Sequence, residues 1–279
     1  MFAAKSPLPA VGLKPVPCPQ LHPRPNAAPN ALPARPSIDH LMLSFIVPAY
    51  NEELELPATL EAIRAAAGAA EREYEIIVVD DASTDATPHI ALAFGAKVVT
   101  VSLRHIAAVR NAGARAAHGE ILFFVDADTR IAPEHVSGAL RALAKGAAGG
   151  GARVEIEGEI PAWARVLVRV FSTLYFANNL GAGAFLFTTR DNFETVGRFD
   201  EQYYAGEEIY FSQVLKKIGR FQLLNQQPVL TSGRKLRMHS FRHLILRMFG
   251  IMLGGTRAVR SRAKLDLWYD GKREKKIAD

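Results

Sequence analysis

Four short apolar segments, separated by stretches of helical composition, constrain the fold of this chain more than any other feature. The segments are residues 43–47, 76–79, 98–101 and 121–125. The stretches between them are rich in alanine or leucine at helical spacing, and they cover residues 56–70, 87–94 and 107–117. Strands that alternate with helices require right-handed crossovers and predict an α/β fold with a mostly parallel sheet. Because the apolar segments show little alternation, we expect helices on both faces of that sheet.

Polar clusters follow three of the four predicted strands. They are Pro48-Ala49-Tyr50-Asn51-Glu52-Glu53, Asp80-Asp81-Ala82-Ser83-Thr84-Asp85 and Asp126-Ala127-Asp128. The carboxyl ends of parallel strands meet at one edge of a sheet, which is where open α/β sheets bind ligands. A ligand crevice is therefore expected at this edge.

Asp126 and Asp128 are candidate metal ligands. Side chains two residues apart point to the same side of a strand, so a hard divalent ion can be shared between these carboxylates and a diphosphate. Burying unpaired carboxylates is costly, which also favours a cation or a positive partner here. The alternative is an acidic turn that caps the next helix, because aspartate and Thr129 both suit turns and N-caps.

Asp80 and Asp81 indicate a nucleoside site. A carboxylate at a sheet end can accept a hydrogen bond from a base N–H or a ribose hydroxyl. Residues 83–85 are explained as well by an N-cap of the following helix. The chain has no Gly-x-Gly-x-x-Gly and no Walker lysine loop, which argues against dinucleotide and P-loop chemistry.

Six sequence pieces, in this order, resemble the family 2 glycosyltransferases. They are VPAYNEE, VVDDASTD, RNAGARAAHGE, FFVDADT, GAGAFLFTTRDNFETVGRFDE and GEEIYF, and together they cover most of residues 43–230. The resemblance implies the GT-A fold, a Rossmann-like and mostly parallel sheet flanked by helices. It also implies a metal-dependent, inverting transfer of a single sugar from a nucleotide-diphospho-sugar to an acceptor hydroxyl. The Gln-x-x-Arg-Trp motif of the processive synthases is absent, so a non-processive enzyme is expected.

The matching positions imply roles for individual residues. Those implied to bind the nucleotide and diphosphate are Pro48, Tyr50, Asn51, Glu52, Asp80, Asp81, Arg110, Asn111 and Asp126. Asp81 matches the acid that holds the base, and Asp128 matches the direct ligand of Mn²⁺ or Mg²⁺, with Asp126 beside it. Such an ion offsets the charge that develops on the departing diphosphate. Without the resemblance, Arg110 also reads as a surface arginine on the following helix.

The second half of the chain supplies the predicted acceptor side. Gly181 and Gly183 resemble the family's glycine-containing stretch, where backbone approaches the donor sugar; packing of a tight bend explains them equally well. Glu207 and Glu208 align with a Glu-Asp motif whose second acid is the general base. Glutamate replaces the commoner aspartate here, and we favour Glu208 over Glu207. Two acids in the first turn of a helix are the structural alternative.

Composition divides the chain into three parts. Residues 1–40 hold ten of the sixteen prolines and predict a disordered leader, residues 41–230 form the GT-A domain, and residues 231–279 form a basic, partly apolar, helical extension. The formal charge of the three parts is about +3, −6 and +9. In the extension, Arg234 is implied to fold over the donor and to pair with its diphosphate.

The expected partners are a nucleotide-diphospho-sugar donor and an acceptor that is lipid-linked or a glycan, with no nucleic acid. Residues 234–262 could rest on an anionic membrane or pack on the catalytic domain. No apolar stretch of membrane-spanning length and no secretory h-region occur, so a cytoplasmic protein is expected, peripheral at the inner face of the membrane if the extension binds there. The alternative functions are a sugar-1-phosphate nucleotidyltransferase and a non-catalytic sugar-nucleotide-binding protein.

Overall fold

The computed structural model describes residues 38–157 and 180–233. The predictions for the proline-rich leader up to residue 37 and for residues 234–279, Arg234 included, lie outside the described residues. Within the described part of the chain, no helix has the length and apolar character needed to cross a membrane.

The first half of the fold is the predicted alternation of strands and helices. Its strands are β1 (Leu43–Ala49), β2 (Tyr74–Asp81), β3 (Lys97–Val101) and β4 (Ile121–Val125). The helices between them are α1 (Leu56–Gly68), α2 (Thr87–Ala93) and α3 (Ile106–Ala116). The four strands are parallel and lie in the order β3-β2-β1-β4, which confirms the α/β class and places the carboxyl ends of all four strands at one edge.

The second half adds strands that make the sheet mixed. The described elements are η1 (Ile38–His40), β5 (Thr129–Arg130), α4 (Pro133–Ala144), β6 (Ala147–Glu157), β7 (Phe185–Thr189), α6 (Arg190–Thr195), α7 (Glu207–Ile218) and β8 (Arg220–Ser232). The sheet has the order β3-β2-β1-β4-β7-β6-β8-β5. β7 runs antiparallel to β4 and β6, whereas β6 and β8 pair in parallel. β8 ends at Ser232, close to residue 230, where the sequence places the end of the domain. This domain boundary stays a prediction.

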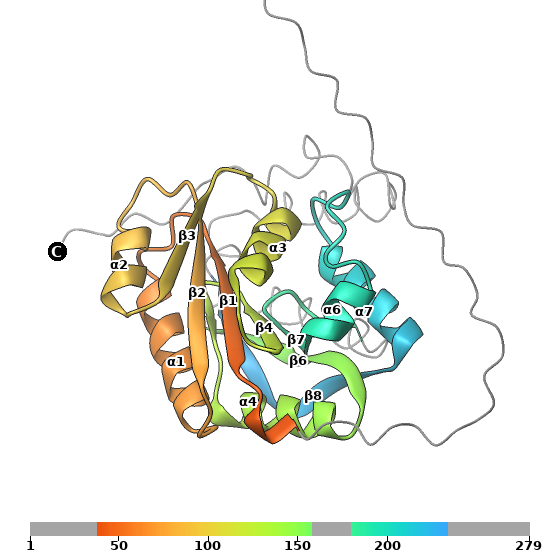
Figure 1. Cartoon of the computed structure of the whole chain (residues 1–279). Helices are drawn as coiled ribbons and strands as arrows, with labels where there is room; N and C mark the ends of the chain where they lie inside the picture. The colour runs from red at the N-terminus through yellow and green to blue at the C-terminus, as the bar shows by residue number, and fades with distance from the viewer. Residues whose placement is uncertain (1–37, 158–179, 234–279) are drawn as a thin grey trace, which may run out of the picture. The chain divides into compact units, whose positions relative to one another are not determined.

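Helices cover both faces of the sheet, as the lack of alternation predicts (Figure 1). On β1, Phe45 and Val47 pack with α1, α2 and α4, while Ile46 points to the opposite face and packs with α3, α6 and α7. Every residue of β1 is buried. A central strand of this kind has no solvent face, so both sets of its side chains are apolar apart from Ser44, whose hydroxyl donates to Glu75 Oε1 at 2.7 Å.

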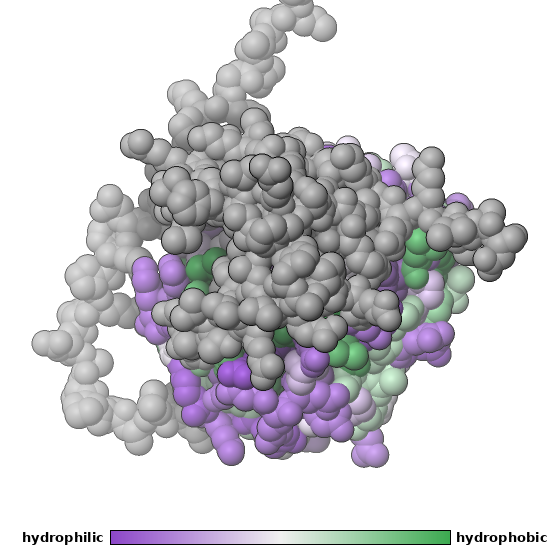
Figure 2. Space-filling view, turned by 180° about the vertical axis from the view of Figure 1, so that it is seen from behind, coloured by the Kyte–Doolittle hydropathy of each residue, from purple (hydrophilic) through white to green (hydrophobic). Residues whose placement is uncertain are grey.

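Exposed apolar side chains on the described surface are scattered. The large ones are Leu54, Tyr74, Leu92, Leu103 and Ile218. From behind, the described surface is mainly hydrophilic along its lower margin, with hydrophobic residues showing at the right (Figure 2). Single exposed apolar residues of this kind are normal in folded proteins.

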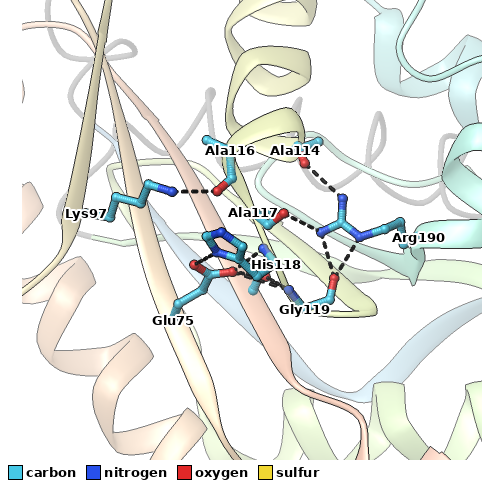
Figure 3. Close-up of polar contacts among 9 residues, drawn as sticks. Glu75, Lys97, Ala114, Ala116, Ala117, His118, Gly119 and Arg190 are labelled. Carbon is cyan, nitrogen blue, oxygen red and sulfur yellow. Dashed lines mark hydrogen bonds and ion pairs between the residues drawn. The ribbon is translucent and has the colours of Figure 1, made fainter.

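Arg190 binds the C-terminal end of α3 (Figure 3). This end of the helix lies opposite the carboxyl ends of the parallel strands. Its guanidinium donates to the carbonyl oxygens of Ala114 at 3.1 Å, Ala117 at 2.8 Å and Gly119 at 2.7 and 3.0 Å. Lys97 donates to the carbonyl of Ala116 at 2.7 Å. Carbonyls at a helix C-terminus lack partners within the helix, so these two cations satisfy them and fix where α3 ends.

Replacing Arg190 should destabilise the fold. Arg190→Met leaves several half-buried carbonyls without their donor, and we expect the free energy of unfolding to fall by about 2–4 kcal/mol. Urea denaturation measures this change. Arg198→Met, which removes an exposed ion pair with Glu194, is the control and should cost less than about 1 kcal/mol. Equal losses in the two variants would contradict the assigned role of Arg190.

Candidate active site

A pocket opens at the carboxyl ends of β1, β2 and β4, where the sequence places its polar clusters. Its volume is about 320 Å³. Ten of the predicted site residues line it: Pro48, Tyr50, Glu52, Asp81, Arg110, Asp126, Asp128, Gly183, Glu207 and Glu208. The segments that carry them are far apart in sequence and meet only because the parallel strands end at the same edge.

The remaining described candidates, Asn51, Asp80, Asn111 and Gly181, do not line this pocket. Asn111 binds the segment before α7: its Nδ2 donates to Phe199 O and Glu201 Oε1, both at 2.9 Å, and its Oδ1 accepts from Phe199 N at 3.1 Å. The structure thus gives Asn111 a supporting role, and direct contact of these four residues with a donor stays a prediction.

Asn51 joins the loop after β1 to the loop after β2. Its backbone N–H donates to Ser83 Oγ at 2.9 Å, and its Oδ1 accepts from Thr84 N at 2.8 Å. Asn51 has φ 52°, a left-handed conformation that asparagine tolerates better than most residues. Nearby, Glu52 N donates to Thr87 Oγ1 at 2.8 Å. These bonds hold the two pocket loops together.

Asp80 and Asp81 fix loops at the end of β2. Asp80 Oδ1 accepts from Ser83 N at 3.2 Å, which closes the turn into α2. Asp81 Oδ1 accepts from Leu103 N at 2.7 Å and from Arg104 N at 3.0 Å. Asp81 therefore positions the loop between β3 and α3 while its carboxylate still lines the pocket.

Asp126 and Asp128 lie in a turn and not on a strand. β4 ends at Val125, and the turn is closed by the bond from Thr129 N to Asp126 O at 3.0 Å. Strand periodicity predicts that the two side chains point in the same direction. That argument does not apply here, because neither residue lies on the strand. Asp126 Oδ1 binds Arg110 at 2.7 Å, whereas Asp128 Oδ1 accepts from Thr231 Oγ1 at 3.4 Å. The two carboxylates have different partners.

Arg110 is a buried clamp and not a surface arginine, since its side chain is only 2% exposed. Nη1 pairs with Glu207 Oε1, while Nη2 pairs with Asp126 Oδ1 at 2.7 Å and donates to Gly183 O at 3.0 Å. Burial alone would lower the pKa of Arg110, but the charges of Asp126, Glu207 and Glu208 raise it above its usual range. Arg110 stays charged and joins α3, the Asp126 turn and α7.

Gly181 and Gly183 are explained by packing. A Cβ at Gly183 would lie 2.8 Å from Arg110 Nη2, and a Cβ at Gly181 would lie 2.3 Å from Leu186 Cδ2. Each distance is too short for a real contact, so an added side chain at either position would force the neighbouring Arg110 or Leu186 side chain to move. Gly183 also lines the pocket, so the predicted approach of its backbone to the donor sugar stays compatible with the structure.

Glu207 and Glu208 begin α7, as the helical alternative predicts, but they have different surroundings. Glu207 is buried and paired with Arg110. Glu208 is partly exposed at the pocket wall. Desolvation, followed by the charge of Glu207, raises the pKa of Glu208 to about 8, even though Arg110 acts in the opposite direction. Glu208 is thus an acid poised to exchange a proton near neutral pH.

Three pocket residues with polar or aromatic side chains were not predicted from the sequence: Arg104, His105 and Tyr204. The guanidinium of Arg104 stacks on the Tyr50 ring, with its Cζ 3.5 Å from the ring centroid. The His105 ring packs on Tyr204 with a centroid distance of 4.3 Å, and His105 Nδ1 accepts from Ala108 N at 3.4 Å to cap α3. Arg104 and His105 lie shortly before Arg110, and Tyr204 lies shortly before Glu207, so only this proximity in sequence could have drawn attention to them.

The Asp126 turn fits a divalent ion that arrives with a phosphate ligand. Among residues 38–157 and 180–233, no group of three or more His, Cys, Asp or Glu side chains forms a closed metal site. Asp128 lines the pocket, is partly exposed, and makes only the 3.4 Å side-chain bond among described residues. Mg²⁺ and related ions commonly bind one or two carboxylates together with substrate phosphates. Asp128 suits this role better than Asp126, which Arg110 already engages.

A methyl group at Gly183 should disturb the clamp. Gly183→Ala forces Arg110 or the bend to shift, and we expect a loss of about 1–3 kcal/mol in the free energy of unfolding. Gly68→Ala is the matched control, because a Cβ at Gly68 meets nothing within 4 Å; it should be neutral or slightly stabilising. Chemical denaturation compares the two. If Gly183→Ala were as stable as wild type, the close packing of Arg110 on this bend would be wrong.

Comparison with solved structures agrees with this fold. Glucosyl-3-phosphoglycerate synthase of Mycobacterium tuberculosis, in complex with Mn²⁺ and UDP, matches with a TM-score of 0.55 and 19% identity over 84% of this chain and 82% of that one. A mannosyltransferase of Pyrobaculum calidifontis, in complex with GDP-Man and Mn²⁺, matches with a TM-score of 0.58 and 19% identity over 83% of this chain and 68% of that one.

Curated relatives match over a shorter range. An undecaprenyl-phosphate 4-deoxy-4-formamido-L-arabinose transferase of Aeromonas hydrophila is 33% identical over 39% of this chain and 35% of its own length. A dolichyl-phosphate β-glucosyltransferase of Drosophila melanogaster is 40% identical over 32% of this chain and 31% of its own length. The matched region thus spans about a third of these relatives.

The family model named Glycosyl transferase family 2 matches residues 44–227. This range runs from β1 into β8 and includes every described residue of the pocket. The match covers more than half of the chain and agrees with the arrangement of the strand ends. The chain therefore belongs to glycosyl transferase family 2 and has its GT-A fold.

Proposed function

We propose that this protein is a metal-dependent, inverting glycosyltransferase that moves one sugar from a nucleotide-diphospho-sugar to an acceptor hydroxyl. The observation that carries the proposal is the convergence of Asp81, Asp128 and Glu208 on one pocket. In this proposal the nucleoside binds near Asp81 at the end of β2, and the diphosphate binds near Asp128 in the turn after β4. The acceptor approaches from Glu208 on α7. The solved structures of similar fold that hold UDP or GDP-Man together with Mn²⁺ support this donor class.

The donor's nucleoside lies, in this proposal, between Tyr50 and Asp81. Tyr50 offers an aromatic surface, and Asp81 offers a carboxylate that accepts hydrogen bonds. The bonds of Asn51 and Glu52 to the loop after β2 keep this end of the pocket in place. Preformed loops reduce the entropy that donor binding would otherwise cost.

At the diphosphate, Asp128 is the proposed ligand of Mn²⁺ or Mg²⁺, with Asp126 as its neighbour. A bound divalent ion would stabilise the negative charge that develops on the leaving nucleoside diphosphate. Asp126 has a second task, since its ion pair with Arg110 fixes the turn on which Asp128 lies. Arg110 consequently orients the site without contacting the acceptor.

On the acceptor side, Glu208 is the proposed general base. Glu207 is committed to the ion pair with Arg110, whereas Glu208 carries no ion pair among the described residues and lies at the pocket wall. Glu208 would take the proton of the acceptor hydroxyl as the oxygen attacks the anomeric carbon from the side opposite the diphosphate. A pKa near the working pH suits this exchange.

The acceptor of the sugar could be either a phosphate group or a hydroxyl group, and the two need different chemistry. Two relatives are named for transfer to undecaprenyl-phosphate or dolichyl-phosphate, and a phosphate-ended acceptor is already an anion that needs no base. A hydroxyl acceptor does need one. We propose the hydroxyl because the Glu208 carboxyl is held at the pocket wall with its pKa raised to about 8.

Loss of Asp128 should remove metal binding together with activity. In Asp128→Asn, Mn²⁺ affinity in the presence of UDP should fall by more than about tenfold, the loss seen even when an outer-shell partner is removed. Calorimetry measures the affinity, and EDTA should abolish wild-type turnover reversibly. Asp191→Asn, at an exposed acid of α6, is the control and should bind Mn²⁺ like wild type. Full activity of wild type in chelator would contradict the metal role.

Loss of Glu208 should remove catalysis while donor binding persists. The wild-type rate at low substrate should rise with pH and level off above about pH 8, because Glu208 is a base only after it loses its proton. Glu208→Gln should be slower by about 10²–10⁴-fold and lack this rise. Glu207→Gln, which keeps a hydrogen-bond acceptor for Arg110, should retain the rise but at lower pH, because the charge of Glu207 no longer raises the pKa of Glu208. Near-normal turnover of Glu208→Gln would exclude Glu208 as the base and favour a phosphate-ended acceptor.

A further inference from the structure

Arg130 is a partly buried arginine two residues after Asp128, and it does not line the pocket. It lies on β5, the short strand that follows the Asp128 turn and the last strand in the order of the sheet. β5 pairs antiparallel with the last residues of β8, with Thr129 opposite Thr231 and Arg130 opposite Leu230. The turn that carries Asp128 is therefore continuous with this strand pair.

The end of β8 binds the turn at two points. Ser232 N donates to Asp128 O at 3.1 Å, and Thr231 Oγ1 donates to Asp128 Oδ1 at 3.4 Å. From α1, the fully buried Thr59 donates through Oγ1 to Ala127 O at 2.8 Å. The contacts with β8 involve both the backbone and the carboxylate of Asp128. The position of that carboxylate consequently depends on where the end of β8 lies.

Arg130 holds the end of β8 through two carboxylates. Its Nη2 donates to Glu55 Oε2 at 3.0 Å, and its Nη1 forms an ion pair with Glu157 Oε2 at 2.7 Å. The other oxygen of Glu55, Oε1, accepts from Ser232 Oγ at 2.8 Å. At the end of β6, Glu157 O accepts from Gly233 N at 3.2 Å. Arg130 thus joins the loop before α1, the end of β6 and the end of β8.

The two acidic partners of Arg130 differ in exposure. The Glu55 side chain is 15% exposed and binds with both of its oxygens, whereas the Glu157 side chain is 46% exposed. Solvent screens an exposed ion pair, so such a pair contributes little. A largely buried carboxylate with charge-assisted hydrogen bonds is held more firmly in one geometry. The contact of Arg130 with Glu55 is therefore the one that fixes β8 beside Asp128.

We propose that Arg130 is a positioning residue for the metal site, because its contact with Glu55 holds the end of β8 against Asp128. This inference rests on the proposed function, which makes Asp128 the ligand of the ion. Groups that orient a metal ligand without touching the ion commonly control metal affinity. Loss of Arg130 therefore weakens metal binding although the side chain lies outside the pocket.

Calorimetric titration of Mn²⁺ into the protein tests the inference, with UDP present in one series and GDP in a second. In Arg130→Met, Mn²⁺ affinity should fall by about tenfold, the lower end of the loss seen when an orienting group is removed. Arg130→Lys keeps a cation that reaches one carboxylate and should restore part of the lost affinity. Glu55→Gln should also bind Mn²⁺ more weakly than wild type, whereas Glu157→Gln should bind it like wild type.

Arg198→Met is the matched control, because it removes an arginine ion pair with Glu194 that lies outside the pocket. It should keep the wild-type Mn²⁺ affinity. Thermal unfolding checks that each variant is folded at the temperature of the titration. If Arg130→Met does not fold, Arg130→Lys and Glu55→Gln decide the question.

A folded Arg130→Met or Glu55→Gln variant that binds Mn²⁺ as tightly as wild type overturns the inference, since a merely structural role would lower stability alone. An equal loss of affinity in Glu157→Gln overturns the assignment of Glu55 as the partner through which Arg130 acts. If wild type binds Mn²⁺ with neither nucleotide, or if Asp128→Asn binds it as tightly as wild type, the proposed function fails instead.

Discussion

The site depends on one buried guanidinium. Arg110 reaches from α3 to the turn after β4, to the carbonyl of Gly183 and to the first turn of α7. A buried charge is tolerated only when it is paired and hydrogen-bonded, so these elements must meet at Arg110 in one geometry. Removing one partner from such a buried group typically costs about 3–5 kcal/mol. Glycine at position 183 leaves room for the guanidinium, whereas a Cβ there would lie 2.8 Å from Arg110 Nη2 and would force the clamp to shift.

The clamp also separates the acids of the pocket into two classes. Asp126 and Glu207 pair with Arg110, while Asp128 and Glu208 form no ion pair among the described residues and lie at the pocket wall. Each motif contains two acids, and the structure gives one of each pair a positioning role and leaves the other at the pocket wall. This division accounts for four of the six carboxylates around the pocket, and the charge of Glu207 adds to desolvation in raising the pKa of Glu208.

Much of the first half of the fold follows from the sequence. The apolar segments from Leu43 to Val125 and the helices between them lie where periodicity places them, because buried parallel strands leave an unmistakable apolar pattern. The strands β6, β7 and β8 were not predicted. Gly149, Gly150 and Gly151 in β6 lack the side chains that mark a strand, and β8 interrupts its apolar pattern with Asn225, Gln226 and Gln227. Pairing with neighbouring strands, a tertiary effect, decides their conformation.

The residues of the site were predicted better than their contacts. Asp81, Asp126, Asp128 and Glu208 line one pocket as expected, whereas Asp80 does not. The sequence does not reveal that Arg110 is buried, that Asn111 binds Phe199, or that Arg104 lies on Tyr50. Such pairs are separated widely in sequence and depend on how loops of different strands meet. Arg104 and His105 are the pocket residues most easily overlooked, because nothing in their local pattern distinguishes them from surface residues.

The most direct test of this account is a crystal structure of the protein with Mn²⁺ and a bound nucleoside diphosphate. The account predicts Mn²⁺ on Asp128 and the diphosphate, with Arg110 still paired to Asp126 and Glu207 and with Glu208 facing the sugar position. If Arg110 instead left Asp126 and Glu207 to bind the diphosphate, the division of the acids into positioning and reacting groups would be wrong.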